Sequence, residues 1–160
     1  MPVTKDEFRR VLSHWASGIT VITTHCDGGI HGMTASSFCS LSLEPPLVLI
    51  SVAKHARTHG FIAAQRVFAV HILGEGQEAF SDRCAGRSGQ QNDLLEGVAY
   101  HPEATGAPVL DDCAAWLDCR LWATYDGGDH TIYVGEVEAA ALSPQRPLVW
   151  WEHAYHRLPG

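Results

Sequence analysis

The sequence lacks the features of a secreted, membrane-spanning or strongly basic protein. Lys and Arg number 11 against 18 Asp and Glu, so the formal net charge is −7. This balance disfavours a broad electrostatic surface for nucleic acid or anionic lipid. The apolar runs are too short to cross a bilayer, and the N-terminal MPVTKDEFRR has no apolar core of a signal peptide. We therefore expect a cytoplasmic protein that binds neither nucleic acid nor membrane.

Cysteine pairs with useful spacing are also missing. The five cysteines are an odd set without a CxxC motif, which predicts free thiols in a reducing compartment and not a disulfide framework. Cys84 and Cys119 have apolar neighbours, which favours a role as small core residues.

Several catalytic and cofactor signatures are absent. No GxGxxG follows a strand and opens a helix, so a Rossmann domain is unsupported, and no GxSxG marks a hydrolase nucleophile. The pairs His55/His59 and His153/His156 have close spacing, but neither belongs to an HExxH motif or a thiolate cluster. We therefore predict no metal site.

The pattern of hydrophobic residues predicts a single domain over residues 1–160, in which strands outnumber helices. Hydrophobic residues make up 46% and charged residues 18%, which is a globular balance. A helix is expected from Thr4, with Glu7 completing a capping box, to Gly18. Further helices are expected at 55–65 and 77–85. Strands are expected at 18–24, 30–38, 47–52, 67–73, 117–125, 130–142 and 148–151.

These elements favour a mainly β fold, a Greek-key-type antiparallel β-barrel with flanking helices. The strand spacing is too irregular for successive βαβ units. Residues 86–107 are rich in Gly, Pro and polar residues, which indicates a loop that serves as a lid or a connection across the barrel end. The pair Trp150–Trp151 fits the barrel core or an interface better than stacking on a planar ligand.

Three polar segments are candidate binding sites. In GMTASSF (32–38), small and hydroxyl-bearing side chains would let a flat ligand approach the backbone, although an ordinary Ser/Thr-rich strand would look the same. In SVAKHART (51–58), a strand end, basic side chains and a helix start that Thr58 could cap suit a phosphate, with a solvated basic loop as the alternative.

The third segment is GGDH (127–130), at a predicted hairpin turn. Asp129 could orient the imidazole of His130, or His130 could contact a ligand directly. A plain hairpin turn with a capping Asp is the alternative.

In this order and spacing, the segments resemble the short-chain flavin reductase family, which has the FMN-binding split-barrel fold. The resemblance covers nearly the whole chain, and the set GMTASSF, EPPLVL and GDH-to-GEV carries it most specifically. It also includes the stretches at 8–24, 31–52, 68–73, 81–86, 128–137 and 147–158.

The resemblance implies an NAD(P)H:flavin oxidoreductase that reduces FMN or FAD with NADH or NADPH and supplies reduced flavin to a separate monooxygenase. It also implies a homodimer. His130 would act catalytically by positioning the nicotinamide over the flavin, not as an acid or base. The cofactor-binding residues would be Met33, Thr34, Ala35, Ser36, Ser37, Ser51, Val52, Ala53, Lys54, Arg57, Thr58, Arg87, Asp129 and His130.

The chain departs from the family pattern in two places. Many relatives carry Phe at the position of Cys84 and Tyr in place of Trp150 and Trp151. Two other functions stay open: a non-enzymatic split-barrel protein that binds flavin or haem, and a flavin-dependent oxidase with its own substrate. The segment that contains His130 argues against both.

Overall fold

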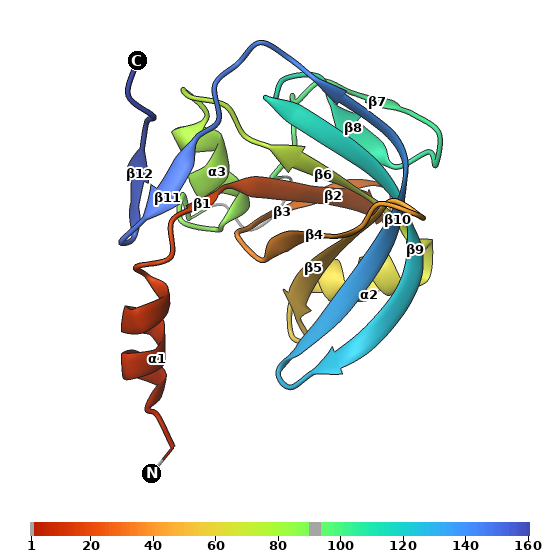
Figure 1. Cartoon of the computed structure of the whole chain (residues 1–160). Helices are drawn as coiled ribbons and strands as arrows, with labels where there is room; N and C mark the ends of the chain where they lie inside the picture. Colours follow the sequence, from red (N-terminus) through yellow and green to blue (C-terminus); the bar gives the residue numbers. More distant parts are fainter. Residues whose placement is uncertain (1, 90–93) are drawn as a thin grey trace.

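The computed structural model describes residues 2–89 and 94–160 and is built around one antiparallel sheet of seven strands (Figure 1). The strands follow the order β3-β2-β6-β9-β10-β5-β4. Their bounds are β2 Thr20–Cys26, β3 Gly29–Ala35, β4 Phe38–Ser42, β5 Leu47–Ala53, β6 Val67–Ile72, β9 Ala115–Gly127 and β10 His130–Leu142.

The two edge strands of this sheet, β3 and β4, are consecutive in the sequence. Only Ser36 and Ser37 separate Ala35 from Phe38, and so short a connection spans roughly 10 Å at most. The two edges must therefore meet at that corner, which curls the sheet into a barrel whose seam is open along the rest of its length. The predicted antiparallel, mainly β barrel is confirmed, whereas the single strand predicted at 30–38 is divided at this corner.

Three helices and two small sheets surround the barrel. The helices are α1 Lys5–Leu12, α2 Arg57–Gln65 and α3 Glu78–Cys84. The first small sheet holds β1 Ser17–Gly18, β11 Val149–Trp151 and β12 Ala154–His156, and the second pairs β7 Tyr100–Pro102 with β8 Pro108–Leu110. In the described part of the chain, no helix has the length and apolarity needed to cross a membrane.

Helix α1 begins as predicted but ends earlier. The capping box is present, since Glu7 N donates to Thr4 Oγ1 at 3.2 Å and Thr4 N donates to Glu7 Oε2 at 2.9 Å. The helix stops at Leu12 because Ser17 and Gly18 pair instead with Trp150 and Val149.

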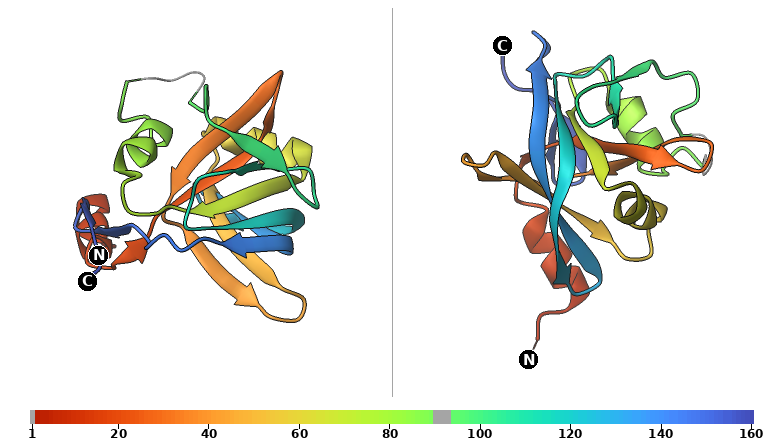
Figure 2. Two further views of the ribbon diagram at one scale, coloured as in Figure 1. Left: turned by 90° about the horizontal axis from the view of Figure 1, so that it is seen from above. Right: turned by 90° about the vertical axis from the view of Figure 1, so that its right-hand side faces the viewer.

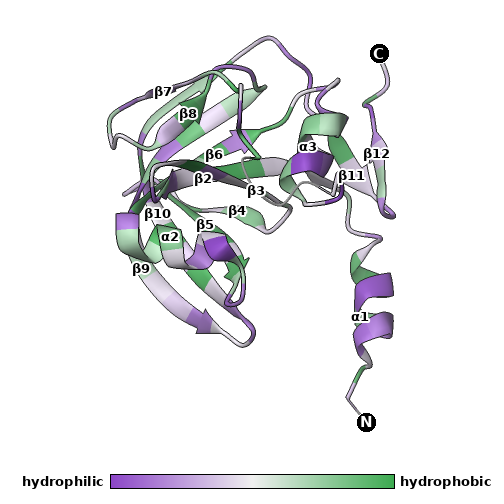
Figure 3. Ribbon diagram, turned by 180° about the vertical axis from the view of Figure 1, so that it is seen from behind, coloured by the Kyte–Doolittle hydropathy of each residue, from purple (hydrophilic) through white to green (hydrophobic). Residues whose placement is uncertain are grey.

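Helix α1 stands apart from the barrel, beside the β11–β12 hairpin (Figures 2 and 3). The two are joined by a hydrogen bond from Glu152 N to Ser13 O at 2.9 Å. None of the residues of α1 is buried.

The segment 86–107 contains more structure than the predicted loop. Its last part forms β7 and turns into β8, where Tyr100 pairs with Leu110. The buried carboxylate of Asp118 accepts from Thr105 N at 2.7 Å and from the Thr105 hydroxyl, which fixes the turn before β8 to β9. Residues 90–93 of the predicted loop lie outside the described residues.

The barrel interior is filled by apolar side chains such as Ile22, Ile50 and Phe68. Gly135 on β10 has no side chain because an added Cβ would lie 2.6 Å from Phe68 Cζ and 2.9 Å from Cys119 Cβ. Cys84 and Cys119 are buried, which confirms their predicted role as core residues, and all five cysteines are free.

Candidate functional site

The β3–β4 corner is held in place by hydroxyl groups. Ser37 Oγ donates to Ser51 O at 2.8 Å, and Ser51 N donates to Ser37 O at 3.2 Å, which locks the corner onto β5. Thr34 Oγ1 donates to Ser81 O at 2.6 Å, which ties β3 to α3. Ser36 is exposed between these anchors. The predicted small-residue segment therefore forms a rigid and partly open backbone surface.

A cavity of about 120 Å³ lies at this corner, and we call it the corner cavity. One wall is an aromatic and cationic pair, with the Arg87 guanidinium 4.8 Å from the ring centre of Trp150. The lining residues are Ile19, Thr34, Ser36, Ser81, Ala85, Arg87 and Trp150.

A larger hollow of about 550 Å³, the α2 groove, begins next to the corner cavity. Both are lined by Ala85, and Met33 in the groove is adjacent to Thr34 in the cavity. The two spaces thus follow β3 from the corner to the start of α2. The groove is lined by His31, Gly32, Met33, His55, Ala56, Arg57, Thr58, Cys84, Ala85, Gly86 and Leu94.

The prediction that Thr58 caps a helix is wrong. The N-cap of α2 is Ala56, whose side chain has no hydrogen-bonding group, and Thr58 lies inside the first turn. Its buried hydroxyl lies 3.0 Å from His31 Nε2 on β3. Residue 58 therefore faces the groove and links its two walls.

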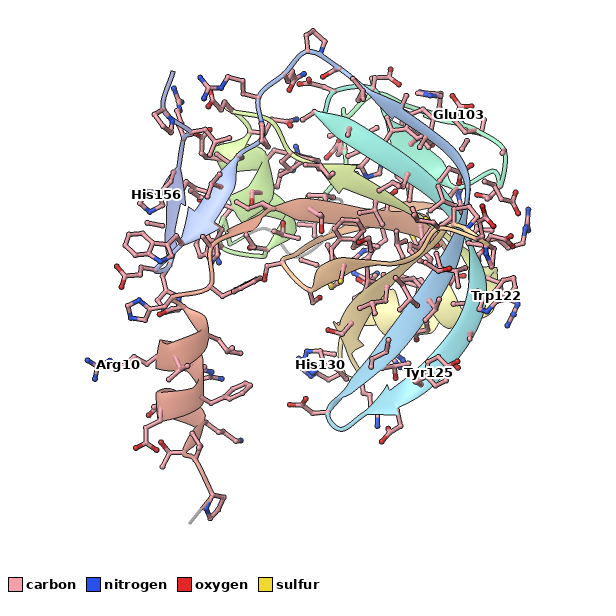
Figure 4. All side chains as sticks on the ribbon, in the orientation of Figure 1. Arg10, Glu103, Trp122, Tyr125, His130 and His156 are labelled. Carbon is pink, nitrogen blue, oxygen red and sulfur yellow. The ribbon has the colours of Figure 1, made fainter. Side chains whose placement is uncertain are left out.

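The predicted β9–β10 hairpin presents the third candidate segment (Figure 4). His130 Nδ1 donates to Asp129 Oδ1 at 2.6 Å, and this hydrogen bond lowers the pKa of Asp129 below its usual value. Lys54 N donates to Asp129 O at 3.0 Å, and Lys54 Nζ forms an ion pair with Asp126. The carboxylate of Asp129 therefore orients the imidazole, and the end of β5 fixes the hairpin.

The structure brings most of the predicted site residues together, but not all by their side chains. The side chains of Ala35 and Val52 belong to the barrel core, so a ligand in the cavities would meet only their backbone. Ser51 and Ala53 alternate with Val52 along β5, and Lys54 follows at the strand end, where Ala53 pairs with His130. His130 lines neither the corner cavity nor the α2 groove, and lies opposite the last residue of β5.

Several lining residues escaped the sequence-based prediction. His31 and Ser81 were within the resembling segments but lacked a local chemical signal, and Trp150 was expected in the core or an interface. Asp82 and Tyr155 lie behind Arg87, with the Tyr155 hydroxyl 2.5 Å from Asp82 Oδ1 and Arg87 Nη1 3.0 Å from the same oxygen. Only the tertiary structure brings these residues together, since 73 positions separate Asp82 from Tyr155.

The fold and site together define a barrel that can hold a long ligand with a flat part at the corner and a negatively charged part at α2. The "Flavin reductase like domain" family profile matches residues 12–159. The chain belongs to this family, and both the predicted family and the split-barrel fold are confirmed.

Two relatives are similar to this chain over most of their length. The reductase component of 4-hydroxyphenylacetate 3-monooxygenase from Thermus thermophilus is 41% identical over 155 residues, covering 96% of this chain and 97% of the relative. An NADH-dependent FAD reductase from Streptomyces globisporus is 41% identical over 151 residues, covering 91% of this chain and 80% of the relative.

Solved structures agree with this assignment. The NADH:FAD oxidoreductase SgcE6 of Streptomyces globisporus C-1027 superposes with a TM-score of 0.92 at 35% identity, covering 100% of this chain and 96% of that one. The same enzyme in complex with NAD and FAD fragments gives a TM-score of 0.88 at 36% identity, covering 97% and 93% of the two chains.

Proposed function

We propose that this protein is an NADH-dependent flavin reductase that delivers reduced flavin to a separate monooxygenase. The observation that carries the proposal is the continuity of the corner cavity with the α2 groove along β3. Relatives named as an NADH-dependent FAD reductase and as a monooxygenase reductase component support the donor and the destination of the electrons. An FMN reductase (NADH) from Agrobacterium fabrum, 39% identical, supports either flavin as the acceptor.

The residues that line the two spaces fit a flavin nucleotide. The corner offers a fixed backbone surface at Met33–Ser37 and the stacked pair of Arg87 and Trp150 for a flat ring. The α2 groove offers Arg57, Thr58 and an N-terminal helix turn for a phosphate. Ser51, Val52, Ala53 and Lys54 extend this surface toward the hairpin.

In this proposal, the chain supplies position and electrostatics. A bound flavin provides the hydride acceptor and NADH the hydride, which is chemistry of the cofactors themselves. His130, held by Asp129, positions the nicotinamide at the mouth of the site and does not exchange a proton in the reaction. Both residues sit at an exposed hairpin end, which suits a substrate that must enter and leave in every turnover.

We further infer a cytoplasmic homodimer. The apolar side chains of α1 and of the turn after it are unusually exposed, from 52% for Leu12 to 78% for Trp15, with Phe8 and Val11 between these values. Contiguous exposed apolar surface of this kind is typical of protein interfaces. The five free thiols favour a reducing compartment.

The activity is tested by mixing purified protein with NADH and FMN, FAD or riboflavin and following the loss of NADH absorbance. We expect oxidation of NADH with free flavin and no organic substrate. Absence of turnover with every flavin and either nicotinamide would overturn the proposal. The homodimer is tested separately by light scattering, where Val11→Glu should produce monomers and Glu7→Gln, on the same helix, should not.

A further inference from the structure

The α2 groove contains a histidine that the proposed function does not yet use. His31 lies on β3, two residues before Met33, and is half-buried. Its ring packs edge-on against Phe61 of α2, with 5.3 Å between ring centres. The guanidinium of Arg57 lies 5.6 Å from the centre of the same Phe61 ring. The Phe61 ring therefore contacts two groups that can be cationic, the His31 imidazole and the Arg57 guanidinium.

The surroundings of His31 are electropositive. Burial, and then the charge of Arg57, lower the pKa of the His31 imidazole below its usual value, so the ring is neutral near pH 7. The other titratable groups that line the groove are His55 from the segment before α2 and Cys84 from α3. Burial raises the pKa of the Cys84 thiol to about 12, so it too is neutral. No carboxylate is among the described lining residues.

Such a pocket is poised for an anion and not for a cation. A phosphate monoester carries close to two negative charges near neutral pH. Placed between Arg57 and His31, it would reverse the electrostatic environment that keeps the imidazole neutral, because an opposite charge within about 4–6 Å favours the protonated form of a histidine.

We propose that His31 binds the flavin phosphate and that the His31 imidazole takes up a proton from solvent when the nucleotide binds. This inference deepens the proposed function and rests on it. Free riboflavin lacks the phosphate and would bind without this proton uptake. His31 would therefore discriminate flavin nucleotides from the vitamin and would make their affinity dependent on pH.

Thr58 extends the effect of that proton. Thr58 is 1% exposed, and its hydroxyl lies 3.0 Å from His31 Nε2. Both ring nitrogens of a protonated imidazole are donors, so Nε2 then donates to Thr58 Oγ1. The hydroxyl hydrogen is thereby released to donate toward the phosphate. The added proton would thus give the anion one new donor, the Thr58 hydroxyl from α2, beside the Nδ1–H from β3 that a neutral ring accepting at Nε2 already carries.

The proton uptake is measured directly by titration calorimetry. FMN and riboflavin are each titrated into the wild-type protein in two buffers of different ionisation enthalpy, at about one pH unit above the ordinary histidine pKa. We expect uptake of a fraction of a proton per FMN and none with riboflavin. Equal uptake with both ligands, or none with either, would overturn the role of His31. This comparison needs no variant.

A matched pair of variants assigns the proton to one residue. His31→Gln keeps an amide nitrogen near the position of Nε2 but does not titrate, and His55→Gln removes the other imidazole of the groove. We expect His31→Gln to abolish the uptake and weaken FMN binding about tenfold, with riboflavin affinity unchanged. His55→Gln should retain the uptake. Loss of uptake only in His55→Gln would overturn the assignment.

The result also separates this inference from the proposed function. If both ligands bind and NADH is oxidised, but uptake does not depend on the phosphate, only the role of His31 fails. If no flavin binds and no NADH is oxidised, both fail together. Unchanged riboflavin affinity in His31→Gln shows at the same time that the variant is folded.

Discussion

The hydroxyl of Tyr155 donates a 2.5 Å hydrogen bond to Asp82 Oδ1, although 73 positions separate the two residues in the sequence. The same oxygen accepts from Arg87 Nη1 at 3.0 Å, and Arg87 in turn covers the ring of Trp150. Tyr155 also packs edge-on against Trp150, with 4.9 Å between ring centres. The C-terminal strand β12 thereby holds the cationic wall of the corner cavity in one orientation.

Tyr155→Phe should loosen flavin binding without changing the chemical step. The hydrogen bond from Tyr155 is the largest cause of the lowered pKa of Asp82. Without this hydrogen bond, the Asp82 carboxylate and the Arg87 guanidinium that it binds are held less firmly. We therefore expect the KM for flavin to rise several-fold with kcat unchanged. Tyr100→Phe, on the exposed strand β7, serves as the control. A lower kcat with an unchanged KM would contradict the positioning role.

His130→Ala should raise the KM for NADH about tenfold and leave flavin affinity intact, since His130 lines neither cavity. Asp129→Asn should have a smaller effect in the same direction, because an amide holds the imidazole less strongly than a carboxylate. Steady-state kinetics and flavin titration separate the two affinities. Tyr125→Phe, at an exposed position on β9 of the same hairpin, is the control, and a collapse of flavin affinity in His130→Ala would disprove the assignment.

The protein should lose stability in mild acid because of His71. This side chain is fully buried, with Nδ1 2.9 Å from Val21 O and Nε2 accepting from Leu110 N at 3.0 Å. Burial is the main cause that lowers the pKa of His71 to about 4. The unfolded chain, with a histidine pKa near 6.5, binds more protons below that pH, so the stabilisation is complete above about pH 6.5 and declines toward pH 4.

Urea unfolding of wild type and His71→Gln measures this linkage. Gln cannot titrate, so the stability advantage of the wild type should shrink by about 2 kcal/mol between pH 7.5 and pH 5. The comparison removes the contribution of carboxylates, which both proteins share. An advantage that is constant with pH would contradict a neutral, buried His71.

The turn between β11 and β12 stores backbone strain that a single substitution should relieve. Trp151 pairs with Ala154, so Glu152 and His153 form a two-residue turn with φ of 46° and 60°. Positive φ values at both positions define a type I′ turn, which favours Asn-Gly. We expect His153→Gly to raise the free energy of unfolding by about 0.5–1 kcal/mol and His153→Val to lower it. Denaturant unfolding of the two variants decides, and the opposite order would contradict the strain.

Local chemistry made the helices and the longer strands predictable, whereas the short strands β7, β8 and β12 and the assembly of the site depend on contacts distant in sequence. The capping box of α1 and the β-branched strands were visible within a few residues. The contact between His31 and Thr58, which are 27 positions apart, has no such local signal. A threonine near a helix start has the sequence pattern of an N-cap whether or not it caps the helix. The end of α1 was misplaced because β1 is only two residues long and forms through its distant partner β11.

The open seam of the barrel has a consequence for how sequences of this type diverge. Strands β3 and β4 each pair with a single neighbour among the described residues, so main-chain groups along the seam are available to a ligand. Recognition through main-chain atoms does not depend on side-chain identity. We therefore expect Ser36, which is exposed between the anchoring residues Thr34 and Ser37, to tolerate alanine replacement better than proline replacement. We therefore expect the cofactor to be retained while side chains that line the site change during evolution.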